Sequence, residues 1–470
     1  MLTQDDISEE QHLAIDRLYE HDETLLLAPK GFGKCMVAYT AISDLLADKV
    51  LERVLVLAPA QVCTETWALE AEKWEHLDYD EVAVLTGHTE KQRTAQLMME
   101  SSVVVANFEL LPWLIDYYGK DWPFDGLLVD EITKLKSVGG TTFRKFRKYI
   151  PKFKWSAGLT ADPCAQETED IYGQMLVVDK GKALGRNKEM FLRKYFMSLD
   201  FNDRQWQLQP GGGERLAKAI EGVIYRVNDE QYEKDLPELR DFEIEVEMPD
   251  STREKYVTLA RDDFAMIGDL ELEAPNAAVL QGKLHQMCNG SVYVDDEIDE
   301  GETVYKVREM VWLDSAKRIA LDSLLAQSTD SPKLIAYQFD FERVYMQQEY
   351  GAPVYSSQLS PKKKKILRED WDAGEIPIML VHPKSAGHGL NLQYGPCHTL
   401  ICLSYFWSAD MYDQLLGRLR RRGQASKFVN RYTFVTRNSV EDHVMKPRLA
   451  SREESSERFD KYIAELKGSD

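Results

Sequence analysis

The sequence lacks several features that would place it in a specialised class of protein. It contains no run of about 18 apolar residues, the length that a membrane-spanning helix requires. Its first ten residues lack the basic and apolar regions of a secretory signal. Neither solenoid repeats nor low-complexity segments are evident. We therefore expect a globular protein of the cytoplasm that has no membrane partner.

Cysteine is sparse and shows no paired pattern. The six cysteines include no C-x-x-C pair, and no histidines at metal-ligand spacing accompany them. A disulfide framework and a structural zinc site are therefore not indicated.

Positive charge is also scarce. Lys and Arg number 58 against 79 Asp and Glu, which gives a formal net charge of −21 at pH 7. Such a protein is not expected to adhere to DNA over its whole surface, because binding to phosphates requires cations. Any contact with nucleic acid must be local. Three basic clusters could make one, at residues 144–154, 362–365 and 418–422.

Short apolar runs alternate with longer stretches of helical period in two parts of the chain. Six runs lie near residues 25–28, 54–57, 82–85, 103–106, 127–129 and 155–159, and five more lie near residues 334–337, 354–356, 376–381, 399–403 and 432–435. Strands that are apolar on both faces and alternate with helices are typical of parallel sheets covered on both sides. The sequence therefore predicts an α/β protein with two doubly wound parallel-sheet domains.

The remaining segments set the expected domain boundaries. Residues 163–313 contain few apolar runs and many Lys, Glu and Tyr residues, which favours a mostly helical insertion and linker. We expect a first domain at residues 1–163, a helical insertion and linker at 164–245, a second domain with a helical beginning at 246–450, and a charged tail at 451–470. Nucleotides bind at the carboxyl ends of strands in such folds, so two domains that face each other can hold one ATP in the cleft between them.

A glycine-spaced loop follows the first apolar run. Residues 28–35 read Ala-Pro-Lys-Gly-Phe-Gly-Lys-Cys, and Gly-Lys stands at the predicted start of a helix. In such a loop the backbone N–H groups, the helix N-terminus and Lys34 can form a cradle for phosphate. The match to G-x-x-x-x-G-K-[ST] is imperfect, because Ala28 replaces the first glycine and Cys35 replaces the hydroxyl residue that contacts Mg²⁺. Taken alone, the segment fits a chance loop equally well.

Two later segments fit the same chemistry. Asp130 and Glu131 follow an apolar run, where a P-loop ATPase needs one acid for Mg²⁺ and another to orient or deprotonate the attacking water. Residues 414–424 place several guanidinium groups on one predicted helix, and Arg418 and Arg421 would share a face of it. Such groups can stabilise a γ-phosphoryl transition state, although a solvated basic helix has the same pattern.

Together these segments resemble the superfamily two helicase-type ATPases of the Swi/Snf-like branch, in particular the compact versions of bacteriophages and bacteria. Nine segments match the family's motifs in order and cover nearly the whole chain. They are Gln11 and residues 28–35, 56–74, 103–109, 130–137, 158–163, 333–339, 385–393 and 414–424. Asp235-Leu-Pro237, with Tyr256, resembles the crossing between two lobes. The resemblance implies that both sheets belong to RecA-like domains.

The resemblance also implies a role for each matched residue at the nucleotide. Lys34 would bridge the β- and γ-phosphates, Asp130 would hold Mg²⁺, and Glu131 would be the catalytic base. Arg421 would be the arginine finger, with Arg418 as its partner and Gln414 as a sensor of the γ-phosphate. Further contacts to ATP would come from Gln11 at the adenine and from Pro29, Lys30, Gly31, Phe32, Gly33, Cys35, Gly389 and Asn391, with Cys35 also beside the metal.

Contacts to DNA are implied in both lobes. The matched residues are Pro59, Ala60, Asn107, Phe108, Gln338, Ser385 and Ala386. In addition, Ser360-Pro361 predicts a helix start, and four lysines follow it. Cations at a helix N-terminus oppose its dipole at a cost of about 0.3–1 kcal/mol each, so helix stability does not explain them. Lys362, Lys363 and Lys364 are either phosphate contacts or a solvated basic turn. For the cluster at residues 144–148, a solvated face is favoured.

Two residues depart from the family pattern. A thiol at Cys35 is a poor ligand for the hard Mg²⁺ ion, and Thr133 stands where His or Asp is common. We expect ATP hydrolysis to persist with weakened affinity for Mg²⁺. The position of Cys35 at a helix N-terminus predicts a lowered thiol pKa and rapid alkylation when no ATP is bound.

The combined expectation is an ATP- and Mg²⁺-dependent motor on duplex, forked or junction DNA. It would serve replication, recombination or branch migration, in the cytoplasm of a bacterial host if the gene is viral, and replication, recombination or host proteins would be its other partners. One alternative is a nucleotide-dependent interaction protein that has lost motor activity and docks on a host protein. Another is an RNA-dependent ATPase.

Overall fold

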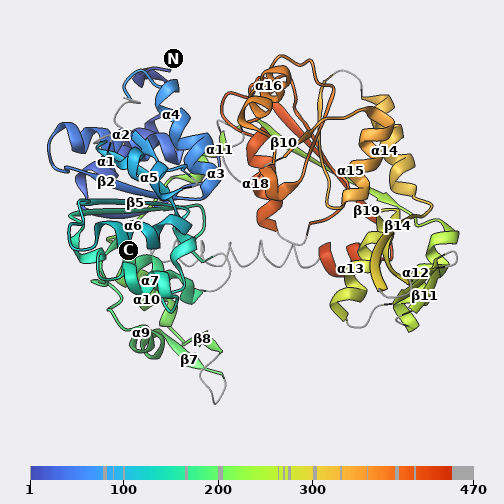
Figure 1. Ribbon diagram of the computed structural model, residues 1–470, viewed down its shortest axis with the longest axis horizontal. Helices are drawn as coiled ribbons and strands as arrows, with labels where there is room; N and C mark the ends of the chain where they lie inside the picture. The colour runs from blue at the N-terminus through green and yellow to red at the C-terminus, as the bar shows by residue number, and fades with distance from the viewer. Residues whose placement is uncertain are drawn as a thin grey trace. The chain divides into compact units, whose positions relative to one another are not determined.

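The computed structural model describes residues 2–446 apart from short gaps. The gaps are residues 78–81, 88, 99–100, 165–167, 200–204, 235, 263, 268–269, 274–276, 300–303, 329–330, 357, 387–390 and 407–408. The described residues form two compact units, 2–234 and 236–446, and both appear in Figure 1. In these ranges no helix has both the length and the apolar character needed to cross a membrane. The predicted charged tail, 451–470, lies outside them.

The first unit contains a parallel sheet that has seven strands among its described residues. In spatial order they are β3 (Val82–Val84), β4 (Val103–Asn107), β2 (Val54–Ala58), β5 (Gly126–Asp130), β6 (Trp155–Thr160), β1 (Glu23–Leu27) and β9 (Ile224–Arg226). All six strands that the sequence predicted here are present. They could be predicted because the central strands are buried on both faces and are therefore apolar at nearly every position.

Helices cover both faces of this sheet. Leu25 and Leu27 pack with residues of α6 (Leu111–Tyr118), α7 (Thr141–Phe146) and α8 (Ile171–Val178). Figure 1 shows α1 (Glu9–Glu20) and α2 (Lys34–Ala47) on the side opposite α6 and α7. The first unit also contains an antiparallel hairpin and further helices. The hairpin consists of β7 (Phe196–Ser198) and β8 (Trp206–Leu208), and the helices include α5 (Glu90–Leu97), α9 (Lys188–Tyr195), α10 (Gly212–Ile220) and α11 (Asp229–Lys234).

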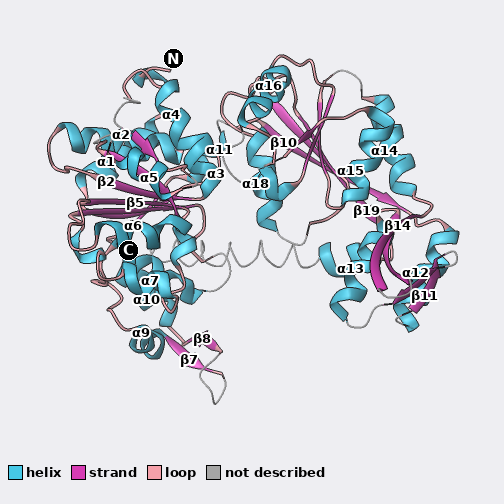
Figure 2. Cartoon of the chain, viewed as in Figure 1, coloured by secondary structure: helices cyan, strands magenta, loops and turns pink. Residues whose placement is uncertain are grey.

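The second unit contains another parallel sheet, with six strands in the part of the chain that is described. Their order is β10 (Glu238–Val246), β19 (Phe428–Thr436), β18 (Thr399–Cys402), β15 (Lys333–Ala336), β17 (Ile378–Val381) and β16 (Val354–Tyr355). Alternate residues of β15 enter different cores. Leu334 packs with α16 (Pro361–Asp372) and α18 (Ala409–Leu419), whereas Ile335 packs with α14 (Ala316–Gln327) and α15 (Asp340–Tyr350). The helices that flank this sheet are visible in Figure 2. Both units are therefore α/β with doubly wound parallel sheets, as predicted.

The expectation of a mostly helical segment at residues 163–313 is wrong in its second half. Helices α12 (Asp250–Asp262) and α13 (Ala277–Cys288) alternate with two antiparallel hairpins, β11–β12 (Phe264–Ile267, Leu270–Glu273) and β13–β14 (Ser291–Asp299, Val304–Trp312). Val292 and Val294 are buried against α13 with period two, the spacing of a strand with one covered face. The many charged residues on the other positions concealed this period in the sequence.

The chain divides between Lys234 and residue 235, at the segment that resembles the crossing between lobes. Strand β9 belongs to the first sheet and β10 to the second. The predicted linker, 164–245, is therefore shared by the two units. Both added strands lie at a sheet edge, where one side is exposed and the apolar run is weaker.

Candidate nucleotide site and its surroundings

The carboxyl ends of the strands bring the predicted motifs of the first unit to one edge of its sheet. Leu27 at the end of β1 is paired with Thr160 of β6, and Asp130 at the end of β5 is paired with Leu159. The loop after β1 and the carboxylates after β5 therefore lie on either side of the end of β6. This edge is where α/β folds bind nucleotides.

The glycine loop ends at the N-terminus of α2. Gly31 and Gly33 have φ values of 91° and 89°, in the left-handed region that favours glycine. A Cβ atom at Gly33 would also lie 2.8 Å from Nε2 of Gln11. Gly33 is the N-cap of α2 and has no side chain with which to accept the N–H groups of the first turn. The loop thus presents backbone donors at the positive end of a 14-residue helix, which suits a phosphate.

The Lys34 ammonium folds back onto this loop. Its Nζ donates to the carbonyl oxygen of Ala28 at 2.9 Å and to that of Pro29 at 3.0 Å. The cation therefore lies at the start of the loop that ends at the N-terminus of α2. Positive charge is concentrated where a phosphate would bind.

Gln11 contacts the same loop from α1. Its Oε1 accepts from the backbone N–H of Ser8 at 3.0 Å, and its Nε2 donates to the carbonyl of Phe32 at 2.7 Å. The side chain is buried. Gln11 thus ties the start of α1 to the glycine loop, and its predicted contact to adenine stays a prediction.

Asp130 is a half-buried carboxylate that accepts a hydrogen bond from an indole. Nε1 of Trp67 donates to Asp130 Oδ2 at 3.1 Å. Burial raises the pKa of Asp130 to about 6, and the Glu131 carboxylate adds to the rise, while the Trp67 hydrogen bond and the Lys34 ammonium oppose it. Trp67 is fully buried, and its polar atom takes part in the site.

Glu131 has an unusual backbone conformation. Its φ of 61° lies in the left-handed region, which costs a non-glycine residue on the order of 1 kcal/mol. Its Oε1 accepts a hydrogen bond from the Thr133 hydroxyl at 3.2 Å. Thr133, which stands where the family commonly has His or Asp, therefore donates a neutral hydrogen bond to the carboxylate that is predicted to act as the base.

Cys35 contradicts the lowered thiol pKa that its place in α2 predicted. Burial raises the pKa of this thiol well above its usual value, and the carboxylates of Glu70 and Asp130 raise it further. A helix N-terminus stabilises a nearby anion by only about 0.3–2 kcal/mol, less than burial and two like charges can cost. The thiol stays protonated, so the rapid alkylation expected from the sequence has no basis here.

The residues present fit Mg²⁺ only in part. Asp130 supplies the oxygen that this ion prefers, and a bound cation would neutralise this half-buried carboxylate. The protonated Cys35 thiol supplies a weak, soft ligand instead. In the described ranges no group of three or more His, Cys, Asp or Glu side chains is arranged to hold a metal. A Mg²⁺ ion here would therefore depend on Asp130, phosphate and water for its ligands.

The predicted arginine segment occupies the end of α18 and the turn after it. Helix α18 ends at Leu419, so Arg418 and Arg421 do not share a helix face, and that prediction is wrong. The turn after the helix contains Gly423, whose φ is 89°. Arg421 instead donates to the side-chain oxygen of Asn391, and the N–H of Leu392 donates to the Arg418 carbonyl at 3.1 Å.

The structure thus brings together two of the predicted nucleotide contacts of the second unit, Asn391 and Arg421. Gln414 lies within α18. Gly389 lies outside the described residues.

Predicted DNA contacts follow strand ends in both units. Pro59 is buried and Ala60 exposed at the start of the short helix α3 (Ala60–Val62) after β2. Asn107 ends β4, and its Oδ1 accepts the N–H of Leu110 at 2.9 Å, while Phe108 is half-buried. Gln338 follows β15. Their contacts to DNA stay predictions.

Other predicted DNA contacts lie on helices of the second unit. Ser385 and Ala386 belong to α17 (Pro383–Ala386), which lies against α18, and nothing is described of their side chains. Helix α16 starts after Ser360, whose hydroxyl accepts the N–H of Lys363 at 3.4 Å, as the sequence predicted. Lys362 and Lys363 are exposed, and Lys364 is half-buried.

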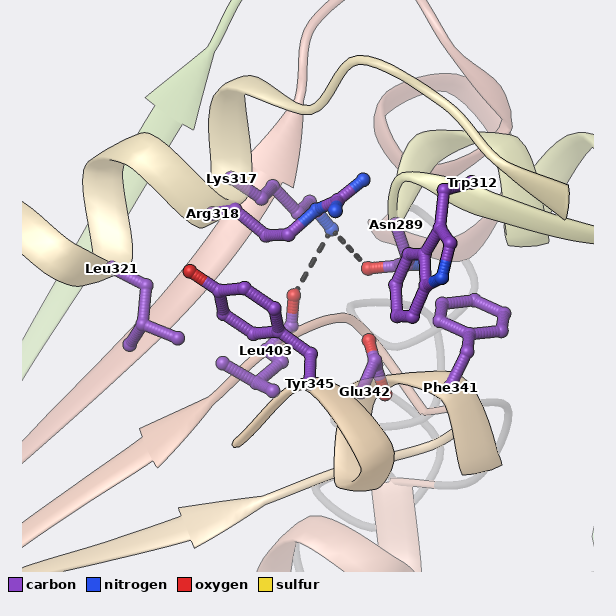
Figure 3. Close-up of a pocket in the computed structure, with 9 residues that line it drawn as sticks. All are labelled: Asn289, Trp312, Lys317, Arg318, Leu321, Phe341, Glu342, Tyr345 and Leu403. Carbon is purple, nitrogen blue, oxygen red and sulfur yellow. Dashed lines mark hydrogen bonds between the residues drawn. The ribbon is translucent and has the colours of Figure 1, made fainter. Parts of the chain in front are cut away.

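A small pocket in the second unit does not fit a nucleotide (Figure 3). Its volume of about 20 Å³ suits about one water molecule. Beside it, the Lys317 ammonium donates to Glu441 Oε1 at 2.7 Å and to Asn289 Oδ1 at 2.9 Å. Burial alone would raise the pKa of Glu441, but the Lys317 ammonium helps to hold it at about 2. This buried ion pair ties α14 to the turn at Glu441–Met445.

Comparisons with known proteins agree in pointing to one family. A family model described as the SNF2-related domain matches residues 12–291. Protein p41 of the Acyrthosiphon pisum secondary endosymbiont phage 1 is 31% identical over 458 residues, which cover 94% of this chain and 95% of that protein.

Two further relatives are more distant. YwqA of Bacillus subtilis, whose name describes an ATP-dependent helicase/translocase, is 25% identical over 225 residues, 44% of this chain and 23% of its own length. A solved SWI2/SNF2 ATPase core of Sulfolobus solfataricus, in complex with double-stranded DNA, has 17% identity and a TM-score of 0.44, with 97% of each chain covered.

Proposed function

The chain belongs to the SNF2-related domain family, and from this membership we propose that it is an ATPase that moves on DNA. The observation that carries the proposal is the arrangement at the edge of the first sheet. There the loop of Gly31 and Gly33 follows β1 together with Lys34, and the Asp130 carboxylate ends β5, on either side of the end of β6. Phosphate and a divalent cation are the ligands that such donors recognise.

Each residue has a proposed role in ATP hydrolysis. The loop and Lys34 bind the phosphates, Asp130 holds Mg²⁺, and Glu131 orients and deprotonates the attacking water. Mg²⁺, when bound, neutralises charge on the phosphates and the leaving group. Arg421, held by Asn391, acts as the arginine finger, with Arg418 as its partner and Gln414 as a sensor of the γ-phosphate. Gln11 fixes the loop and contacts adenine.

The proposed substrate surface is DNA. Pro59, Ala60, Asn107 and Phe108 would contact it in the first unit, and Gln338, Ser385, Ala386, Lys362, Lys363 and Lys364 in the second. YwqA is named as an ATP-dependent helicase/translocase, which supports this proposal by relationship. We further propose a role in replication or recombination in the cytoplasm of a bacterial cell. The relationship to p41, a bacteriophage protein, supports a bacteriophage setting for this role.

ATP turnover with different nucleic acids tests the proposed function. The purified chain is expected to hydrolyse ATP faster with duplex, forked or four-way-junction DNA than without nucleic acid. Glu131→Gln keeps the size of the side chain and removes the base, so turnover should fall by about 10²–10⁴-fold while ATP still binds.

Two results would favour another function. If ATP binds but no DNA raises turnover, the chain is a nucleotide-dependent interaction protein, as its departures at Cys35 and Thr133 would allow. If RNA stimulates turnover more than DNA does, it is an RNA-dependent ATPase.

A further inference from the structure

Trp67 connects the segment after β2 to the carboxylate proposed to hold Mg²⁺. It is the last residue of the π-helical turn Cys63–Trp67, which joins α3 to α4 (Ala68–Lys73). Its side chain is 0% exposed, and its indole N–H donates to Asp130 Oδ2 at 3.1 Å. A hydrogen bond to an ionised carboxylate is charge-assisted and therefore stronger than one between neutral groups.

The surrounding elements fix the direction of the indole. Strands β2 and β5 are paired, with Leu57 opposite Val129, so the segments that follow them are neighbours. The ring of Tyr39 on α2 lies against the Trp67 ring, with centroids 5.9 Å apart. Single π-helical turns are frequent at functional sites. Trp67 is the last residue of such a turn, and its indole N–H faces Asp130.

Asp130 has particular need of a donor in this chain. P-loop proteins place a hydroxyl residue directly after the loop lysine, next to the metal. Here that residue is Cys35, whose thiol is buried and is only a weak hydrogen-bond donor. The indole N–H of Trp67 is a strong donor that reaches the same carboxylate.

We propose that Trp67 is a positioning residue of the metal site, whose N–H fixes the Asp130 carboxylate in the orientation that receives Mg²⁺ and compensates for the hydroxyl that position 35 lacks. This inference needs one part of the proposed function, namely that the glycine loop binds a nucleotide together with Mg²⁺. When a residue that orients a metal ligand without touching the metal is removed, metal affinity typically falls about 10–100-fold.

The test measures metal binding without hydrolysis. A fluorescent ATP analogue is bound to the full chain, first in EDTA and then with increasing Mg²⁺, to give the affinity for nucleotide alone and for Mg²⁺. Trp67→Phe keeps an aromatic ring and removes the N–H. We expect it to weaken Mg²⁺ binding about 10-fold or more and to leave binding of the metal-free nucleotide unchanged. Trp67→Tyr also lacks the indole N–H and should give the same loss.

Trp155→Phe is the matched control. Trp155 is also buried, and its indole N–H donates to the carbonyl of Leu18 at 2.8 Å. It is the first residue of β6, whereas the proposed site lies at the other end of that strand. It should not change Mg²⁺ affinity. Adding Cys35→Ser to Trp67→Phe returns a hydroxyl beside Asp130 and should recover most of the affinity for Mg²⁺, which a general packing defect would not allow.

The proposal is overturned if Trp67→Phe matches Trp155→Phe in Mg²⁺ affinity, or if it weakens metal-free and Mg²⁺-dependent nucleotide binding equally. Hydrolysis does not enter the measurement. A wild-type chain that binds Mg²⁺ and nucleotide without turnover would contradict the proposed ATPase and still allow Trp67 to be tested.

Discussion

Cys35 occupies the first turn of the helix after the glycine loop with a thiol that is buried and protonated. The sequence placed this residue at the start of the helix after the glycine loop, as the structure has it, because the order of strand, loop and helix is a strong local pattern. It could not give the thiol pKa, because that depends first on burial in the fold and then on Glu70, which is 35 positions away in the chain. For the same reason the hydrogen bond from Trp67 to Asp130 is visible only in the fold.

Replacing the thiol tests what this position does. Cys35→Thr supplies a hard oxygen next to the proposed metal, so the Mg²⁺ concentration that gives half-maximal ATP turnover should fall, by about 10-fold if the hydroxyl orients the ligands as usual. Cys35→Ala removes the sulfur without adding oxygen and should leave the Mg²⁺ requirement near that of the parent. The same requirement in Cys35→Thr and in the parent would show that position 35 does not influence the metal.

At the scale of single elements, the strands that are buried on both faces were predictable, and those with one exposed face were not. Strand β10 has mostly exposed residues, and β13 is mostly acidic after Val294, so neither forms a continuous apolar run. The start of α16 was predicted from Ser360 and Pro361, which have specific roles at a helix N-terminus. The end of α18 was not, because Arg420 and Arg421 are good helix formers and only the turn to Gly423 stops the helix.

The lysines at the start of α16 give a prediction for this element. Changing Lys362, Lys363 and Lys364 to Gln should weaken DNA binding similarly for all sequences. The slope of log affinity against log salt concentration should become shallower by about 0.9 for each phosphate that the variant no longer neutralises. The measurement is a DNA titration at several salt concentrations.

A matched control removes three lysines from the exposed basic cluster of the first unit. Lys145, Lys148 and Lys152 are exposed, and Lys145 already pairs with Asp116 at 3.1 Å. Changing these three to Gln should alter the salt slope less. If both triple variants keep the parental slope, the α16 lysines are a solvated turn.

At the scale of the whole molecule, two parallel-sheet units each contribute part of the proposed chemistry. The first contains the glycine loop, Lys34, Asp130 and Glu131, and the second contains Arg421 with its partner Asn391. The sequence predicted both units because their motifs occur in order along the chain. It misplaced their boundary, since the edge strands β9 and β10 extend each sheet into the expected linker. The central claim is that groups from both units act on one ATP.

Single-turnover hydrolysis by Arg421→Ala tests this claim most directly. Enzyme in excess over ATP, with saturating DNA, gives the rate of cleavage, and a separate titration gives the affinity for ATP. Arg422→Ala is the control, because it removes the same charge one residue further on. The account predicts that Arg421→Ala slows cleavage by about 10³-fold or more while ATP affinity changes only a few-fold, and that Arg422→Ala stays near the parental rate. A parental cleavage rate in Arg421→Ala would contradict it.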